Sequence, residues 1–148
     1  MNYKAIIEIP KNCDRRIHMR YDGSGFEDFG PIKEKIPVND GAMPVAYGYI
    51  VDAINKDEKD NVDVLVFSDK EYKTGDEMDV RIFGLMNRDD GDHKILAVDS
   101  TIDYKSFDDI PTEEQKLIME YFGYQKSIKI MDDKSADEYL KGCTVKEN

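Results

Sequence analysis

The chain has 148 residues, of which 40% are hydrophobic and 36% charged, and this length and composition are typical of one folded domain with one core. Its 32 acidic and 21 basic residues give a net charge of −11, which argues against nucleic acid as a partner because nucleic acids are polyanions. No apolar run approaches the roughly 20 residues of a membrane span, so we expect a cytoplasmic protein with no membrane partner. Cys13 and Cys143 form no zinc-binding pattern, so we expect free thiols. We expect a single domain over residues 1–148.

The first two-thirds of the chain has the pattern of short β-strands. Apolar and β-branched residues alternate with polar ones, and turn dipeptides such as Asp22-Gly23 and Asp90-Gly91 separate the segments. The expected strands cover residues 3–9, 17–21, 47–51, 62–67, 78–83 and 94–98. Short strands at this spacing predict a small β-barrel.

The last third of the chain predicts two helices. A capping-box pattern at residues 112–115 is followed by an apolar stripe at helical spacing and then by Gly123, a natural stop. A second capping-box pattern at residues 135–138 opens a shorter helix that ends at Gly142, and residues 144–148 are expected to fray. The expected fold class is therefore mostly β with α (α+β), with two C-terminal helices packed outside a barrel.

Two groups of acidic residues stand at the ends of expected strands. Glu58, Asp60 and Asp63 lie just before or at the start of the strand 62–67, and a second group at residues 89–92 lies in a turn between later strands. Carboxylates at a rigid strand end can converge and recruit Mg²⁺, which prefers hard oxygen ligands. Both groups could instead be solvated turn residues, since Asp is favoured in turns for local hydrogen bonds. Composition alone does not decide between the two interpretations.

The order of motifs along the chain resembles that of the soluble family I inorganic pyrophosphatases. The similar segments are Glu8-Ile9-Pro10, Pro44 to Ile50, the acidic run with Asp63-Val64-Leu65-Val66, Gly75 with Arg81 and Gly84, and Lys94 to Val98. The most specific of them is the signature acid-x-Asp-Pro-x-Asp, here Glu58-Lys59-Asp60-Asn61-Val62-Asp63. This family has an OB-like five-stranded β-barrel with helices, so the resemblance implies the same layout as the periodicity.

The resemblance implies an enzyme, an inorganic diphosphatase that hydrolyses pyrophosphate to two phosphates with Mg²⁺, several ions per site, or Mn²⁺ as the alternative ion. Asp60 would be the general base that takes a proton from a metal-bound water. The implied metal ligands are Glu58, Asp63, Asp89 and Asp92. The implied substrate-binding residues are Lys94, Lys35, Tyr47, Tyr124 and Glu8. Bacterial members are commonly hexamers, so the resemblance also implies a homo-oligomer.

Some positions depart from the family pattern. Glu58 stands where the family has aspartate, Lys35 where it has arginine, and Gln125 where it has a phosphate-binding lysine. A lysine cannot form the two parallel hydrogen bonds that the planar guanidinium of arginine forms with a phosphate. Either Arg16 or His18 falls near the first phosphate-binding lysine of the family.

The turn that follows the strand 78–83 is shorter than in the family, so either Asp89 or Asp90 could be the metal ligand there. Two alternative functions therefore stay open. The first is a hydrolase of the same fold that acts on another phosphorylated substrate, and the second is a non-catalytic binding module on an OB-like barrel.

Overall fold

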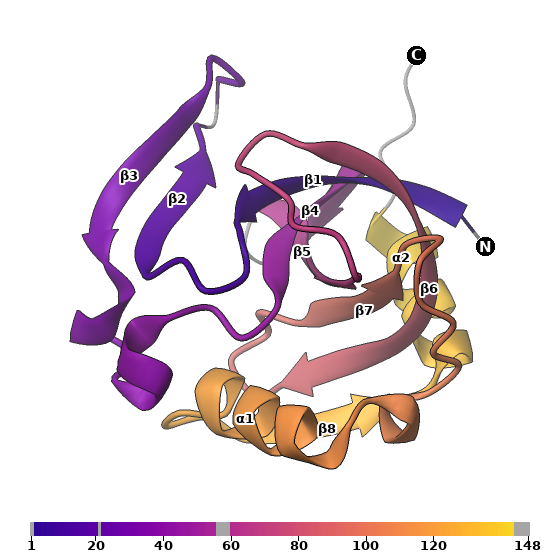
Figure 1. Ribbon diagram of the computed structural model, residues 1–148. Helices are drawn as coiled ribbons and strands as arrows, with labels where there is room; N and C mark the ends of the chain where they lie inside the picture. The colour runs from indigo at the N-terminus through magenta and orange to yellow at the C-terminus, as the bar shows by residue number, and fades with distance from the viewer. Residues whose placement is uncertain (1, 21, 56–59, 144–148) are drawn as a thin grey trace.

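The structure is a computed structural model that describes residues 2–20, 22–55 and 60–143 (Figure 1). Its strands are β1 (Asn2–Ile9), β2 (Arg15–Met19), β3 (Phe26–Pro31), β4 (Ala46–Asn55), β5 (Asp60–Phe67), β6 (Glu77–Arg88), β7 (Lys94–Val98) and β8 (Ile128–Met131). Its helices are α1 (Thr112–Phe122) and α2 (Asp133–Cys143), with short 3-10 helices η1 (Ile32–Glu34), η2 (Val38–Gly41) and η3 (Phe107–Asp109). Glu58 and the tail predicted to fray lie outside the described residues.

Five of the described strands close into a barrel in the order β1-β4-β5-β7-β6, because β6 also pairs with β1. The pair β5–β7 is parallel and the other barrel pairs are antiparallel. Strand β8 extends the sheet beyond β6, while β2 and β3 form a separate two-stranded sheet beside the barrel, on the left of Figure 1. The predicted five-stranded barrel with two C-terminal helices is therefore confirmed.

Strands β3 and β8 were not predicted from the sequence, and strands β4 and β6 are longer than predicted. Strand β3 is mostly exposed and lacks an alternating apolar face, and β8 has only four residues, so neither carries a clear strand pattern. Strand β4 runs on to Asn55, and β6 runs on to Arg88, beyond its predicted end at Phe83. Gly84 and the adjacent apolar residues interrupt the alternation at that point.

The helices lie where they are predicted, but the predicted capping boxes are not formed. Pro111 occupies the N-cap position of α1 without a side-chain cap bond, and Gln115 Nε2 donates to the carbonyl oxygen of Ile110 over 2.6 Å. Helix α2 begins before the predicted Ser135, because Asp132 Oδ1 accepts a hydrogen bond of 2.9 Å from the backbone N–H of Ser135. Asp132 is therefore the capping residue, a role that aspartate fills well.

Alternation along the strands divides the core into two clusters. On β5, the side chains of Val62, Val64 and Val66 belong to the cluster that α2 completes. Those of Leu65 and Phe67 belong to the cluster that α1 completes. Each fully buried side chain of this size contributes about 1.5–3 kcal/mol from its removal from water. The α1 side of the barrel is the side on which the candidate site lies.

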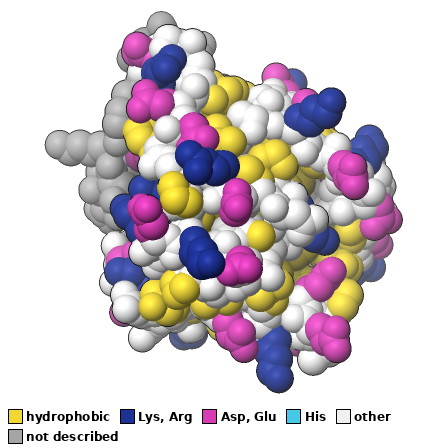
Figure 2. Space-filling model, turned by 60° about the vertical axis from the view of Figure 1, so that its left-hand side comes forward, with side chains coloured by type: hydrophobic (Ala, Val, Ile, Leu, Met, Phe, Trp, Pro, Cys, Tyr) yellow, Lys and Arg dark blue, Asp and Glu magenta, His cyan; other side chains and the backbone are white. Residues whose placement is uncertain are grey.

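The face that carries β2 and β3 shows acidic and basic side chains interspersed with apolar ones (Figure 2). Exposed ion pairs, Arg15 with Asp28 and Arg20 with Glu27, connect the two strands. The negative net charge is therefore not gathered there into one block. Among the described residues, no helix has the length and apolar character needed to cross a membrane.

Candidate active site

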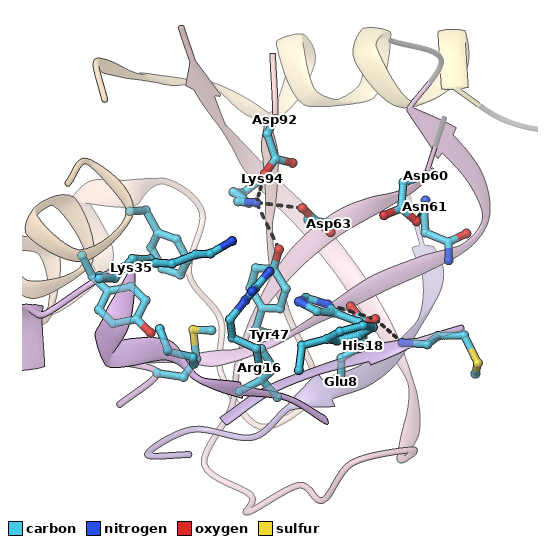
Figure 3. Close-up of a pocket in the computed structure, with 18 of the residues that line it drawn as sticks. Glu8, Arg16, His18, Lys35, Tyr47, Asp60, Asn61, Asp63, Asp92 and Lys94 are labelled. Carbon is cyan, nitrogen blue, oxygen red and sulfur yellow. Dashed lines mark hydrogen bonds and ion pairs between the residues drawn. The ribbon is translucent and has the colours of Figure 1, made fainter. Parts of the chain in front are cut away.

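A cavity of about 610 Å³ lies among the ends of β1, β5 and β7, the β2–β3 sheet and helix α1. Its described acidic lining residues are Glu8, Asp60, Asp63 and Asp92. Its described lysine and arginine residues are Arg16, Lys35, Arg88 and Lys94. Side chains that are distant in the sequence therefore share one space (Figure 3).

Lys94 is the centre of the contacts in this cavity. It is the first residue of β7, and its side chain is 3% exposed. Its Nζ donates to Asp63 Oδ2 over 2.7 Å, to Asp92 Oδ2 over 2.9 Å and to the hydroxyl of Tyr47 over 3.1 Å (Figure 3). Asp63 and Lys94 are direct partners in the parallel β5–β7 register. The barrel itself therefore sets this ion pair.

The three charged groups shift one another's ionisation. Burial raises the pKa of the Asp63 carboxyl to about 7, with the ammonium of Lys94 opposing this rise and the charge of Asp92 adding to it. Burial also acts to raise the pKa of Asp92, but Lys94, the hydrogen bond with Asp63 and the charge of Arg88 together outweigh it and lower the pKa of that carboxyl. Burial disfavours the charged amine of Lys94, and the two carboxylates overcome this and raise its pKa. Because Asp63 and Asp92 interact with each other and with Lys94, the two carboxyls titrate together, and the pair takes up its first proton at a higher pH than an ordinary aspartate does.

The aromatic ring of Tyr47 lines the cavity beside Lys94. Its ring stacks on that of Phe122 in α1, with centroids 6.3 Å apart, and Lys94 Nζ lies 5.1 Å from the Tyr47 centroid. Burial, with the nearby charges of Asp63 and Asp92, holds the pKa of the Tyr47 phenol well above its ordinary value. The hydroxyl therefore keeps its proton and can donate a hydrogen bond to an anion.

Glu8 reaches the cavity through an irregularity in β1. The β1–β4 register shifts between Ile7 and Ile9, a β-bulge that redirects the side chain between them. Glu8 Oε2 accepts a hydrogen bond of 2.8 Å from the backbone N–H of Met19 and lies 3.5 Å from His18 Nδ1. Its contacts therefore fix β2 against the barrel.

Arg16 and Lys35 line the opposite wall. The β2–β3 register shifts between Arg15 and Ile17, where two residues of β3, Phe29 and Gly30, lie opposite Arg16, so the extra residue of the bulge is in β3. Lys35 follows the 3-10 helix η1 directly. Both side chains extend into the cavity in Figure 3. Of the two residues that the sequence places near the first phosphate-binding lysine, His18 is beside Glu8, and Arg16 extends toward Tyr47 (Figure 3).

Asp60 is the first residue of β5 and its side chain is exposed to solvent at the mouth of the cavity. Its Oδ1 accepts a hydrogen bond of 2.7 Å from the backbone N–H of Asn61. That N–H exists because Asn61 stands where the family signature has proline, which has no amide hydrogen. The local contact holds one carboxylate oxygen and leaves the other accessible.

Most of the predicted site residues come together, and two do not. Those that line the cavity are Glu8, Lys35, Tyr47, Asp60, Asp63, Asp92 and Lys94. Asp89 is exposed and does not line the cavity, and its backbone N–H donates to the carbonyl oxygen of Ser127 over 3.0 Å. Tyr124 does not line it either. The roles of all these residues remain predictions.

Arg88 is the lining residue that the sequence reasoning missed. It ends β6, in the part of the strand that lies beyond the predicted boundary. Met86 and Lys94 are partners in the β6–β7 register, and Arg88 lies two residues after Met86. Because strand side chains repeat every two residues, Arg88 falls on the Lys94 side. Continuing the alternation past Gly84 would have found it.

The carboxylates of the cavity suit a divalent cation. Asp63 and Asp92 converge on one amine, Asp60 lines the same space, and Mg²⁺ prefers such oxygen ligands. Over the described ranges, no three acidic, histidine or cysteine side chains already form a metal-binding group. The fit rests on these two partly buried carboxylates, since burial penalises their charge and a cation would offset that penalty. The fold is a small β-barrel, and its cavity combines the acidic and basic side chains that suit a phosphate compound together with divalent cations.

Comparison with known proteins assigns the family. The family model "Inorganic pyrophosphatase" matches residues 5–146. The inorganic pyrophosphatase of Ureaplasma parvum serovar 3 is 32% identical over 136 residues, which are 87% of this chain and 72% of that protein. The inorganic pyrophosphatase of Neisseria meningitidis serogroup B is 32% identical over 133 residues, covering 84% of this chain and 72% of that protein.

A solved structure gives the same result at the level of the fold. The crystal structure of inorganic pyrophosphatase from Ehrlichia chaffeensis superposes with a TM-score of 0.83 at 25% identity, covering 96% of this chain and 92% of that one. The chain therefore belongs to the inorganic pyrophosphatase family.

Proposed function

We propose that this chain hydrolyses inorganic pyrophosphate to two phosphates with Mg²⁺ as its cofactor. Membership of the family supports the reaction, and both curated relatives carry the name of that activity. The observation that carries the proposal is the convergence of Asp63 and Asp92 on the buried Lys94 inside the cavity. The two carboxylates can bind a cation, and the ammonium of Lys94 can bind a phosphate oxygen.

The carboxylates of Asp63 and Asp92 would hold the metal ion, together with Glu58, which is close in the sequence. When bound, Mg²⁺ supplies positive charge to the phosphate oxygens and lowers the pKa of water in its coordination shell. Mn²⁺ would be accepted in its place. Lys94 would then be released from its two carboxylates and would be free to bind a phosphate oxygen.

Asp60 would act as the general base that accepts the proton of the attacking water. Its exposed side chain has access to water, and its contact with the Asn61 N–H orients the carboxylate. A positioned base of this kind contributes roughly 10²- to 10⁴-fold to a rate. The proposal for Asp89 as a metal ligand and for Tyr124 as a phosphate ligand rests on the resemblance alone.

Phosphate oxygens would be bound by Lys94, Arg16, Lys35 and the Tyr47 hydroxyl, and Glu8 would keep Arg16 in place through β2. The charges of the cavity support a role for added cations. Its four described carboxylates balance its four described lysine and arginine side chains, so pyrophosphate would add negative charge that only further cations offset.

The test is phosphate release by the purified chain from a panel of pyrophosphate, polyphosphate, nucleotides and phosphate esters. We expect release from pyrophosphate with Mg²⁺ and none when a chelator removes the metal. Faster release from another member of the panel would favour the hydrolase of different substrate range. No release from any member, together with no calorimetric Mg²⁺ binding, would favour the binding module.

A homohexamer and a cytoplasmic location are further parts of the proposal. The hexamer comes from the resemblance to bacterial family members, and the location comes from the lack of a long apolar run in the sequence. Sedimentation equilibrium should give the mass of six chains. A monomer mass at micromolar concentration would contradict the assembly and would leave the proposed reaction intact.

A further inference from the structure

Arg88 has no counterpart among the motifs that link this chain to its family, yet it lines the cavity. Its side chain is 12% exposed, and its neighbours in the lining include Asp60, Asp92 and Lys94. An arginine this close to the candidate base and the candidate metal ligands can act on the substrate directly.

A carboxylate outside the cavity fixes the plane of the Arg88 guanidinium. Arg88 Nε donates to Asp90 Oδ1 over 3.2 Å and Nη2 donates to Asp90 Oδ2 over 2.6 Å, a two-bond contact of the fork type. Asp90 Oδ1 also accepts the backbone N–H of Asp92 over 3.1 Å. Burial would favour the neutral acid, but these bonds outweigh it and lower the pKa of Asp90, which therefore stays ionised.

The guanidinium retains donors after this contact. It carries five N–H groups, and its two hydrogen bonds to Asp90 use one from Nε and one from Nη2. Because Arg88 is a lining residue and Asp90 is not, the remaining donors are available to an anion in the cavity. A planar fork held in advance loses less entropy when it binds a phosphate than a free side chain would.

The position of Arg88 coincides with a change in the turn that follows β6. The resemblance implies that Asp89, or alternatively Asp90, holds a metal ion in this turn, whereas the described lining of the cavity includes Arg88 and neither of these two residues. The chain also has Lys35 and Gln125 where its family has arginine and lysine. The guanidinium of Arg88 at the end of β6 would therefore provide a fixed positive group that can form two hydrogen bonds to a phosphate, as the arginine at the position of Lys35 would.

We propose that Arg88, oriented by Asp90, binds a phosphate group of the substrate. Its guanidinium supplies positive charge on the side of the cavity where Asp89 was expected to bind a metal ion. This inference rests on the proposed function, since it takes pyrophosphate as the ligand. Arg88 is thus a substrate-binding residue particular to this chain's version of the site.

The experiment measures two affinities by calorimetry on the full chain. The first is for methylenediphosphonate with Mg²⁺ present, because this pyrophosphate analogue has a P–C–P bridge that hydrolysis cannot break. The second is for Mg²⁺ alone. The variants are Arg88→Gln, Arg88→Lys and the matched control Arg81→Gln, which breaks the Arg81–Asp103 ion pair on the same strand away from the cavity.

Arg88→Gln should weaken binding of the analogue roughly 10- to 100-fold, the effect of losing hydrogen bonds to a charged group. Arg88→Lys should recover part of that loss. Binding of Mg²⁺ alone should be unchanged or tighter in Arg88→Gln, because removing a positive charge near Asp92 favours a cation there. Arg81→Gln should match the wild-type chain in both titrations.

Unchanged binding of the analogue in Arg88→Gln would overturn the inference while the proposed function stands. Equal weakening of the analogue and of Mg²⁺ would also overturn it, since that result indicates a structural role for the Arg88–Asp90 pair. If the wild-type chain binds neither analogue nor metal, the proposed function fails and the inference fails with it.

Discussion

Lys94 is buried between Asp63 and Asp92, and the stability of this arrangement depends on all three groups. Removing the ammonium of Lys94 would leave two carboxylates without a counter-charge, which costs about 3–5 kcal/mol for fully buried groups and less here, because the Asp92 side chain is 37% exposed. The cluster is also poorly balanced on its own, with two carboxylates facing one amine. The same imbalance that costs stability in the chain alone favours binding of a cation.

The affinity for Mg²⁺ should depend on pH through Asp63. Its pKa is raised to about 7, so the carboxyl is neutral below that pH and charged above it. The affinity should therefore fall as the pH decreases from about 8 to about 6, a range in which an ordinary aspartate stays ionised. Calorimetric titrations across this range measure the effect.

Asp63→Asn is the control for the pH dependence. It should bind Mg²⁺ more weakly at every pH and should lose the step near pH 7, because the titrating group is gone. A wild-type affinity that stays constant over the whole range would show that Asp63 does not carry the titration.

Among the elements, β1 and β4 approach each other so closely at Gly48 that no other residue fits. A Cβ at Gly48 would lie 1.9 Å from the carbonyl oxygen of Ile6, which is backbone and cannot move aside. Tyr47, the residue before it, pairs with Ile9 in the same ladder. The close approach therefore helps to place the Tyr47 ring beneath Lys94.

Gly48→Ala should lower the free energy of unfolding by about 2–3 kcal/mol or more, since it forces the two strands apart. Urea unfolding followed by circular dichroism measures this. Gly142→Ala in α2 is the matched control, because a Cβ there meets no atom within 4 Å. Alanine should leave stability unchanged there or raise it by up to about 1 kcal/mol. Equal effects of the two substitutions would contradict the packing described for β1 and β4.

The elements also show where sequence reasoning succeeds. Strands made of apolar and β-branched runs, such as β5 and β7, are visible in the sequence, and their residues are mostly buried. Helix α1 is visible from its apolar stripe and its stop. Strand β3 has no apolar run and no buried residue. The residue that caps α2 is Asp132 and not Ser135. Aspartate and serine are both favoured capping residues, so the sequence alone does not choose between them.

At the scale of the whole molecule, the site is assembled from separate elements by register and by bulges. The pairing of Asp63 with Lys94 follows from motifs that the sequence shows. The bulge at Glu8, the bulge of β3 opposite Arg16 and the extension of β6 to Arg88 depend on the neighbouring strands. The acidic residues of the cavity were therefore largely predictable from the sequence, whereas Arg88, one of its four described lysine and arginine residues, was not.

The whole chain should become more stable when Mg²⁺ binds. A ligand that binds only the folded state adds about 2.7 kcal/mol at a hundred times its dissociation constant. Thermal unfolding with increasing Mg²⁺ should therefore give a rising midpoint in the wild-type chain and a much smaller rise in Asp63→Asn. A midpoint that does not respond to Mg²⁺ in the wild-type chain would argue against metal binding at the folded site.

The most direct test of the central claim is the rate of phosphate release from pyrophosphate with Mg²⁺ by Asp60→Asn, compared with the wild-type chain and with Asp79→Asn. Asp79 is an exposed carboxylate on the barrel strand β6 that does not line the cavity. We predict wild-type kcat/KM for Asp79→Asn and a loss of roughly 10²- to 10⁴-fold for Asp60→Asn with its fold preserved. A wild-type rate in Asp60→Asn would contradict hydrolysis at this cavity.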